Sequence, residues 1–169
     1  ALGRTDGSLL WRYQPKTDLT RDADLRLYAS PQPLVMSGVV VVGFSSGELV
    51  GLDVQHGEPV WQQSIGEGRY PDLVATPIAT DKALIVSGYY GPLVALDKQA
   101  RRLLWRVEAG SASPALLHPD RSLLYHPGSN GVLRALDPAT GAVRWRWKSP
   151  DKSALTQPVW TKAGLIVAS

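Results

Sequence analysis

A repeat of about 40 residues constrains the fold of this chain more than any other feature. An aspartate precedes a tryptophan by eight positions three times, at Asp53 and Trp61, Asp97 and Trp105, and Asp137 and Trp145. Prolines at positions 31, 77, 114 and 158 mark a second element of the repeat, at spacings of 46, 37 and 44 residues. One small sheet cannot bury both faces until a neighbour stacks on it, so this period predicts β-propeller blades.

The composition agrees with an all-β protein. The 169 residues include 16 glycines and 13 prolines, and 44% of the chain is hydrophobic. This glycine and proline content favours short strands joined by many turns. No apolar run approaches the roughly 20 residues that a membrane-spanning helix needs. The chain has no cysteine, which excludes disulfides and thiolate metal sites but leaves the cellular compartment open.

Each complete repeat is predicted to form four antiparallel strands. In the third repeat, Asn130-Gly131 is a strong hairpin signal, and the segment from Asp137 to Gly141 has the residues of a tight turn before the outer strand. We expect the following boundaries: outer strands of a blade at 1–12, blades at 30–65, 75–109 and 113–148, and inner strands of a further blade at 156–169.

Four tryptophans occupy the same place in successive repeats: Trp11, Trp61, Trp105 and Trp145. We interpret them as wedges between blades, each burying its ring and donating its indole N–H to a backbone carbonyl. Ligand stacking is the alternative interpretation, since aromatic rings often anchor ligands. Trp147 and Trp160 lie off the repeat, so a surface role remains open for these two.

Charged and titratable residues suggest no catalytic centre. The formal net charge is +3, and the basic residues are spread among acidic ones, which argues against a nucleic-acid surface. His56, His118 and His126 have no metal-ligand spacing, and we expect them in loops or on strand surfaces. The sequence therefore predicts no catalytic residue, no metal and no cofactor.

The segment from Ala135 to Trp145, ALDPATGAVRW, resembles the tryptophan-docking motif of quinoprotein-like propellers, which are built of PQQ-like repeats. Pyrroloquinoline-quinone dehydrogenases share this motif with non-catalytic relatives, chiefly the BamB family of outer-membrane assembly lipoproteins. The stretches from Leu25 to Gln63 and from Asp72 to Trp105 are more similar to the BamB family. The dehydrogenases pair a quinone and a calcium ion with a catalytic aspartate and a vicinal cysteine pair, and the sequence shows no such set.

The resemblance implies a non-catalytic scaffold in the periplasm, associated with the outer membrane, that binds the periplasmic domains of BamA. It implies unfolded outer-membrane proteins as a further partner, and membrane attachment only through an N-terminal lipid anchor that this chain lacks. The matching partner-binding residues are Leu25, Arg26 and Asp72, while Val74 stands where the family has a second acid. A propeller scaffold with another protein partner, or a fragment of a dehydrogenase, is the alternative.

BamB-like propellers have about eight blades, whereas the repeats here account for about four. We therefore expect an all-β partial propeller, a piece of an eight-bladed ring. The alternatives are a closed four-bladed ring, in which 156–169 and 1–12 share one blade, or a half that pairs with a second copy or another propeller half. Exposed strand edges favour the piece or the pair.

Overall fold

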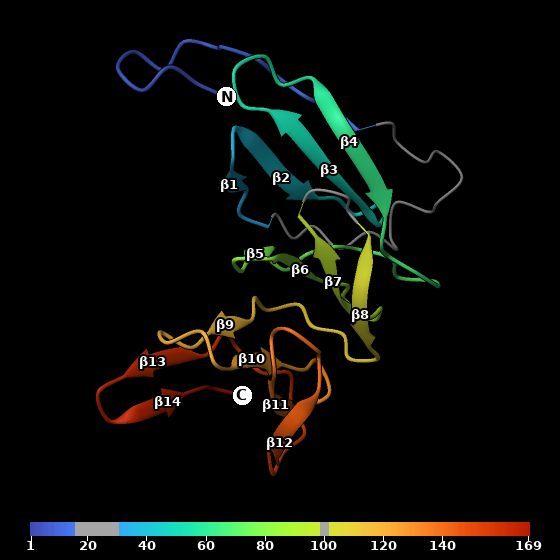
Figure 1. Ribbon diagram of the computed structural model, residues 1–169, viewed down its shortest axis with the longest axis vertical. Coiled ribbons are helices and arrows are strands. Elements are labelled where there is room, and N and C mark those ends of the chain that lie inside the picture. The colour runs from blue at the N-terminus through green and yellow to red at the C-terminus, as the bar shows by residue number, and fades with distance from the viewer. Residues whose placement is uncertain (16–30, 99–101) are drawn as a thin grey trace.

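The computed structural model describes residues 1–15, 31–98 and 102–169. This part of the chain contains three four-stranded antiparallel sheets and one two-stranded sheet (Figure 1). Within each four-stranded sheet, the strands lie in the order in which they occur along the chain, as in a propeller blade. The predicted fold class, an all-β partial propeller of four-stranded antiparallel blades, is confirmed. The described ranges hold no helix of the length and apolarity that crossing a bilayer requires.

The strands have the following bounds. The first blade contains β1 (Leu34–Met36), β2 (Val39–Gly43), β3 (Glu48–Asp53) and β4 (Pro59–Ser64). The second contains β5 (Ile78–Ala79), β6 (Ala83–Ser87), β7 (Leu93–Asp97) and β8 (Leu103–Val107). The third contains β9 (Leu116–Leu117), β10 (Leu124–Pro127), β11 (Val132–Leu136) and β12 (Val143–Lys148). The two-stranded sheet contains β13 (Val159–Thr161) and β14 (Gly164–Ile166), and residues 1–12 contribute an isolated antiparallel bridge between Leu2 and Leu9.

The core of the protein lies between the blades. Figure 1 shows the three blades following one another along the long axis of the molecule. All five residues of β6 are buried, in agreement with the apolar, β-branched sequence of this strand. Two apolar clusters hold the blades together: Val41, Leu49, Leu84, Val86 and Leu96 between the first and second, and Ile85, Leu93, Trp105, Leu124 and Leu136 between the second and third.

The turn between β11 and β12 shows how local sequence produces this geometry. The Asp137 Oδ1 atom accepts hydrogen bonds from the N–H groups of Ala139, at 2.9 Å, and Thr140, at 3.3 Å. A hydrogen bond from Arg144, together with these backbone donors, holds the pKa of Asp137 below its ordinary value. Gly141 closes the turn with a φ of 73°, a conformation that glycine adopts at little cost.

Gly141 also lets the second blade approach the third. A Cβ atom at this position would lie 2.7 Å from a ring carbon of Trp105. We expect Gly141→Ala to lower the free energy of unfolding by about 2–3 kcal/mol, through backbone strain and this clash. Urea unfolding followed by circular dichroism would measure the change.

Gly38→Ala is the matched control for this substitution. Gly38 has a similar φ of 76°, but a Cβ atom there would meet nothing within 4 Å. The control therefore reports backbone strain alone, of about 1 kcal/mol. Equal losses for the two variants would show that the approach of Trp105 does not depend on the glycine.

Candidate protein-binding surface

The connector of residues 65–77 joins β4 to β5 and carries Asp72, one of the predicted partner-binding residues. The side chain of Asp72 is fully buried, with 0% exposure. Its backbone carbonyl accepts a hydrogen bond from the N–H of Tyr89 in the second blade, at 2.9 Å. The next residue, Leu73, donates its N–H to the carbonyl of Phe44 in the first blade, at 3.1 Å. The pair Asp72-Leu73 therefore links two blades.

The same link recurs one repeat later. Gly110 accepts from the N–H of Ser129 at 3.1 Å, and Ser111 donates to the carbonyl of Gly88 at 3.0 Å. Asp72 thus holds the structural position of Gly110, at which the hairpin turns of two blades meet. A loop residue at this position is enclosed by both blades, whereas its sequence suggests an exposed loop. Its direct contact with a partner stays a prediction, and Leu25 and Arg26 lie outside the described residues.

Aromatic residues adjoin Asp72: Tyr70 lies two positions before it, and Tyr89 donates its backbone N–H to the Asp72 carbonyl. We call Arg69, Tyr70, Tyr89 and Tyr90 the tyrosine cluster. The ring centroids of Tyr89 and Tyr90 lie 4.6 Å apart in an edge-to-face contact, and those of Tyr70 and Tyr90 lie 5.6 Å apart. The Arg69 guanidinium carbon lies 5.7 Å from the centroid of the Tyr70 ring, and Tyr90 is 68% exposed. Burial and the neighbouring Tyr90 raise the pKa of Tyr89, so its hydroxyl keeps its proton at neutral pH.

The tyrosine cluster is absent from the corresponding turns of the other blades. Tyr89 and Tyr90 lie in the turn between β6 and β7, where the first blade has Ser45-Ser46 and the third has Ser129-Asn130. Small polar residues therefore suffice for this turn, and the fold does not explain the tyrosines. Sequence reasoning missed them, although aligning the three turns would have revealed the difference. Exposed loop residues that the scaffold does not need are candidates for binding.

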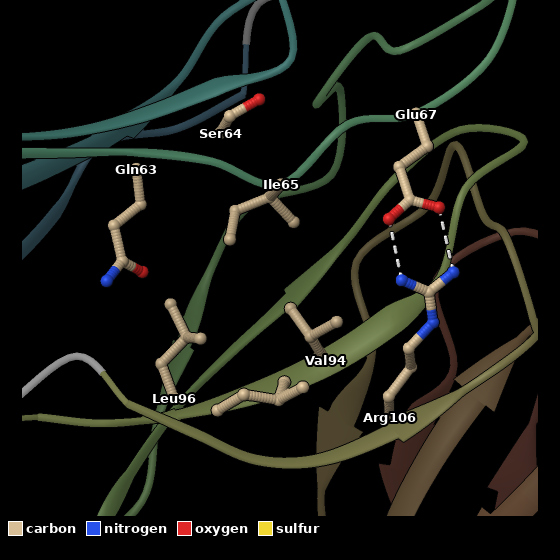
Figure 2. A pocket seen from close by; sticks show the side chains of 8 residues that line it. Gln63, Ser64, Ile65, Glu67, Val94, Leu96 and Arg106 are labelled. Atoms are coloured by element: carbon tan, nitrogen blue, oxygen red, sulfur yellow. Dashed lines mark hydrogen bonds and ion pairs between the residues drawn. The ribbon is translucent and has the colours of Figure 1, made fainter.

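A groove of about 440 Å³ lies between the first and second blades (Figure 2). Val94 and Leu96 of β7 form its apolar wall, and Gln63 and Ser64 line it from β4. At one side the two terminal nitrogens of Arg106 donate to the two carboxylate oxygens of Glu67, at 2.7 and 2.8 Å.

The ion pair in this groove brings together residues of two blades. Glu67 comes from the connector 65–77, and Arg106 comes from β8. The Arg106 side chain also contacts Glu108, with Nε and Oε1 2.5 Å apart. The hydrogen bonds from Arg106 lower the pKa of Glu67, and those to Glu67 and Glu108 raise the pKa of Arg106. The ion pair thus holds the side chains of Glu67 and Arg106 in place at the groove. Both groups stay charged at neutral pH, so neither exchanges a proton there.

Trp105 and Trp11, two of the repeated tryptophans, each connect neighbouring segments. Trp105 donates its indole N–H to the carbonyl of Pro138 in the third blade, at 3.1 Å, and Trp11 donates to the carbonyl of Val54, also at 3.1 Å. Trp61 and Trp145 lie opposite the small residues Gly51 and Ala135, as Trp105 lies opposite Ala95. Trp145 is 41% exposed and packs near Tyr125. The two tryptophans off the repeat, Trp147 and Trp160, are also partly exposed.

The position of His126 corrects the expectation that the histidines lie in loops or on strand surfaces. His126 was expected on a surface, but it is fully buried, because β10 turns it toward the second blade. Its Nε2 atom lies 3.2 Å from the Ser87 hydroxyl. Burial, with a smaller effect of Arg134, lowers the pKa of His126 to about 3, so the ring is neutral.

The other titratable groups make ordinary surface pairs. His56 pairs with Asp53 at 2.9 Å, and His118 pairs with Asp120 at 2.5 Å. Within residues 1–15, 31–98 and 102–169, no group of three or more histidine, cysteine, aspartate or glutamate residues is arranged to hold a metal ion.

Comparison with known proteins identifies relatives of this chain. A family model described as outer membrane protein assembly factor BamB matches residues 1–148. The BamB protein of Legionella pneumophila is 33% identical over 150 residues, which cover 85% of this chain and 38% of that protein. The BamB protein of Yersinia pestis is 28% identical, with 99% of this chain and 42% of that protein covered. The chain thus spans about two fifths of the length of these relatives.

Solved structures show the same fold. BamB from Moraxella catarrhalis aligns with a TM-score of 0.78 and 24% identity, over 96% of this chain and 50% of that chain. A quinohemoprotein alcohol dehydrogenase from Pseudomonas putida aligns with a TM-score of 0.77 and 16% identity, over 98% of this chain and 34% of that chain. At these identities the likeness establishes the fold alone.

Proposed function

This chain belongs to the BamB family of outer membrane protein assembly factors, and we propose that it is a non-catalytic, protein-binding scaffold in that assembly process. The names of the relatives from Legionella and Yersinia support the process, and we place the protein in the periplasm, associated with the outer membrane. The structural likeness to a dehydrogenase carries less weight, because the family match covers residues 1–148. As the partner we propose the periplasmic domains of BamA.

The tyrosine cluster is the observation that carries this proposal. Tyrosine and arginine are enriched among the residues that dominate protein–protein binding energies, and tyrosine offers a large contact area with few rotatable bonds. The three rings support one another, and the hydrogen bond between Tyr89 and the Asp72 carbonyl fixes the backbone beneath them. In this proposal the cluster meets the partner, together with Leu25 and Arg26, and Asp72 positions it.

Exchanging both turn tyrosines for the residues of the third blade tests the cluster. We expect the double variant Tyr89→Ser, Tyr90→Asn to bind the periplasmic domains of BamA at least tenfold more weakly than the unchanged protein. A pair of central aromatic contacts is typically worth about 2 kcal/mol or more. Isothermal titration calorimetry of the full-length protein would measure this loss.

Two further variants complete the experiment. Arg26→Glu is expected to weaken binding as well, while Asp72→Asn tests positioning without placing a new charge in a buried site. Circular dichroism of the double variant should match that of the unchanged protein, because Ser129-Asn130 forms the same turn. Unchanged affinity of a folded double variant would exclude the cluster from the interface.

A further inference from the structure

A row of three positions differs in charge between the blades. In the third blade, His126, Arg134 and Arg146 are cross-strand neighbours on β10, β11 and β12. The same row is Val86, Val94 and Arg106 in the second blade, and Val42, Val50 and Gln62 in the first. Cross-strand neighbours share one face of a sheet, and the contact of His126 with Ser87 places this face toward the second blade. The fold itself therefore does not require two arginines here.

The second blade shows what one of these arginines can bind. Arg106, the counterpart of Arg146, holds the carboxylate of Glu67 through two parallel hydrogen bonds in the groove between the first and second blades (Figure 2). Glu67 reaches Arg106 because the connector 65–77 is long. It contains an additional segment, residues 66–71, before its hydrogen bonds to the two turns at Asp72 and Leu73. The chain thus carries its own example of a carboxylate bound at this position.

The third blade lacks a counterpart of Glu67. The connector between β8 and β9 covers only residues 108–115, and it forms its link at Gly110 and Ser111, directly after the outer strand. It therefore contains no segment corresponding to 66–71. The acidic residue of this connector is Glu108, whose carboxylate already contacts Arg106 at 2.5 Å.

The charges of Arg134 and Arg146 are not balanced within the described part of the chain. Neither residue forms an ion pair there, and the two lie directly opposite each other across β11 and β12, where like charges repel. Arg134 is half-buried and donates to the carbonyl of Val132 at 3.2 Å. His126, beside Arg134, is fully buried, and its Nδ1 atom has no hydrogen-bond partner among the described residues. The positions of His126 and Arg134 are therefore polar in the third blade, whereas valine occupies both of them in the first and second blades.

We propose that the face of the third blade at Arg134 and Arg146 binds a carboxylate from an acidic segment of a partner protein. The two arginines bind this carboxylate through hydrogen bonds, as Arg106 binds the carboxylate of Glu67. Planar guanidinium groups bind planar carboxylates through paired hydrogen bonds, which also fix orientation. The site differs from the tyrosine cluster, so this inference goes beyond the proposed function and does not depend on the identity of the partner.

A capped hexaglutamate peptide is the probe, with capped hexaglutamine as its uncharged counterpart. We expect the full-length protein to bind hexaglutamate saturably at low salt and not to bind hexaglutamine. Arg146→Gln and Arg134→Val should each weaken this binding about fivefold to tenfold, since each removes one charge-assisted contact. Gln and Val occupy these positions in the first blade, so both variants should fold.

Arg144→Gln is the matched control. It removes the same charge from the same strand, but Arg144 is already paired with Asp137, at 2.7 Å. Affinity for hexaglutamate should stay within about twofold in this variant. Equal weakening in Arg144→Gln, or no saturable binding by the unchanged protein, would overturn the proposal. Stronger competition by inorganic phosphate than by the peptide would also overturn it, because the site would then favour a phosphate group.

Discussion

Replacing Trp105 by alanine is expected to lower the free energy of unfolding by about 3–5 kcal/mol, the range found for large-to-small changes of buried aromatic residues. Trp105 is 8% exposed and packs between the second and third blades with Leu124 and Leu136. The variant also loses the hydrogen bond from the indole to the carbonyl of Pro138. Both losses act at the junction of two blades, so the blades should separate more easily.

Trp147→Ala is the control for this experiment. Trp147 lies on the neighbouring outer strand, off the repeat, and is 45% exposed. Its removal should cost about 1 kcal/mol or less, because much of its ring already contacts solvent. Urea unfolding followed by far-ultraviolet circular dichroism compares the two variants. A similar loss for both would show that the repeated tryptophan does not join the blades.

Stability is expected to fall as the pH is lowered from 7.5 to 4.5, because His126 is buried in its neutral form. The pKa of His126 is lowered to about 3 in the folded protein, from about 6.5 in an unfolded chain. The unfolded chain therefore takes up a proton below pH 6.5 that the folded protein does not. The contribution of neutral His126 to the free energy of unfolding is present in full above about pH 6.5, and it is lost progressively as the pH falls toward 3. At pH 4.5 the loss from this group is on the order of 2–3 kcal/mol.

His126→Val isolates this contribution. Valine occupies the corresponding positions in the first and second blades, and the Ser87 hydroxyl keeps a hydrogen-bond acceptor in the carbonyl of Gly88, at 3.3 Å. The variant should lose roughly 2–3 kcal/mol less than the unchanged protein between pH 7.5 and 4.5. His56→Gln, at an exposed position, controls for loss of a histidine. An identical pH dependence in His126→Val would show that His126 is not the titrating group.

Most of the fold could be predicted from the sequence, since its signals are local. The repeat predicted blades of four antiparallel strands, and the β-branched strands β2 and β6 lie within such sheets, β6 fully buried. The segment from Asp137 to Gly141 was predicted as a tight turn, and there Asp137 accepts a backbone hydrogen bond and Gly141 has a positive φ. These features depend on a few neighbouring residues, so the sequence contains the necessary information.

The candidate site was predicted less well, because it depends on contacts between distant segments. Asp72 reads as a loop residue, yet the turns of two blades enclose it. His126 reads as a strand residue of either face, and only the stacking of the third blade on the second buries it. The tyrosine cluster joins Tyr70 of one connector to Tyr90 of a turn in another blade. No local pattern records such contacts.

The sequence by itself determined the repeat, the four-stranded blade and the family to which the chain belongs, because turn residues and alternating hydrophobicity act over a few positions. The tertiary structure decided which polar side chains are buried, which charges are paired and where aromatic residues gather. Glu67 reaches Arg106 because the connector of residues 65–77 is long, whereas the connector of residues 108–115 is short and brings no carboxylate to Arg146 among the described residues. The burial and charge balance of a side chain are set by neighbouring blades, whose arrangement is fixed only when the sheets stack.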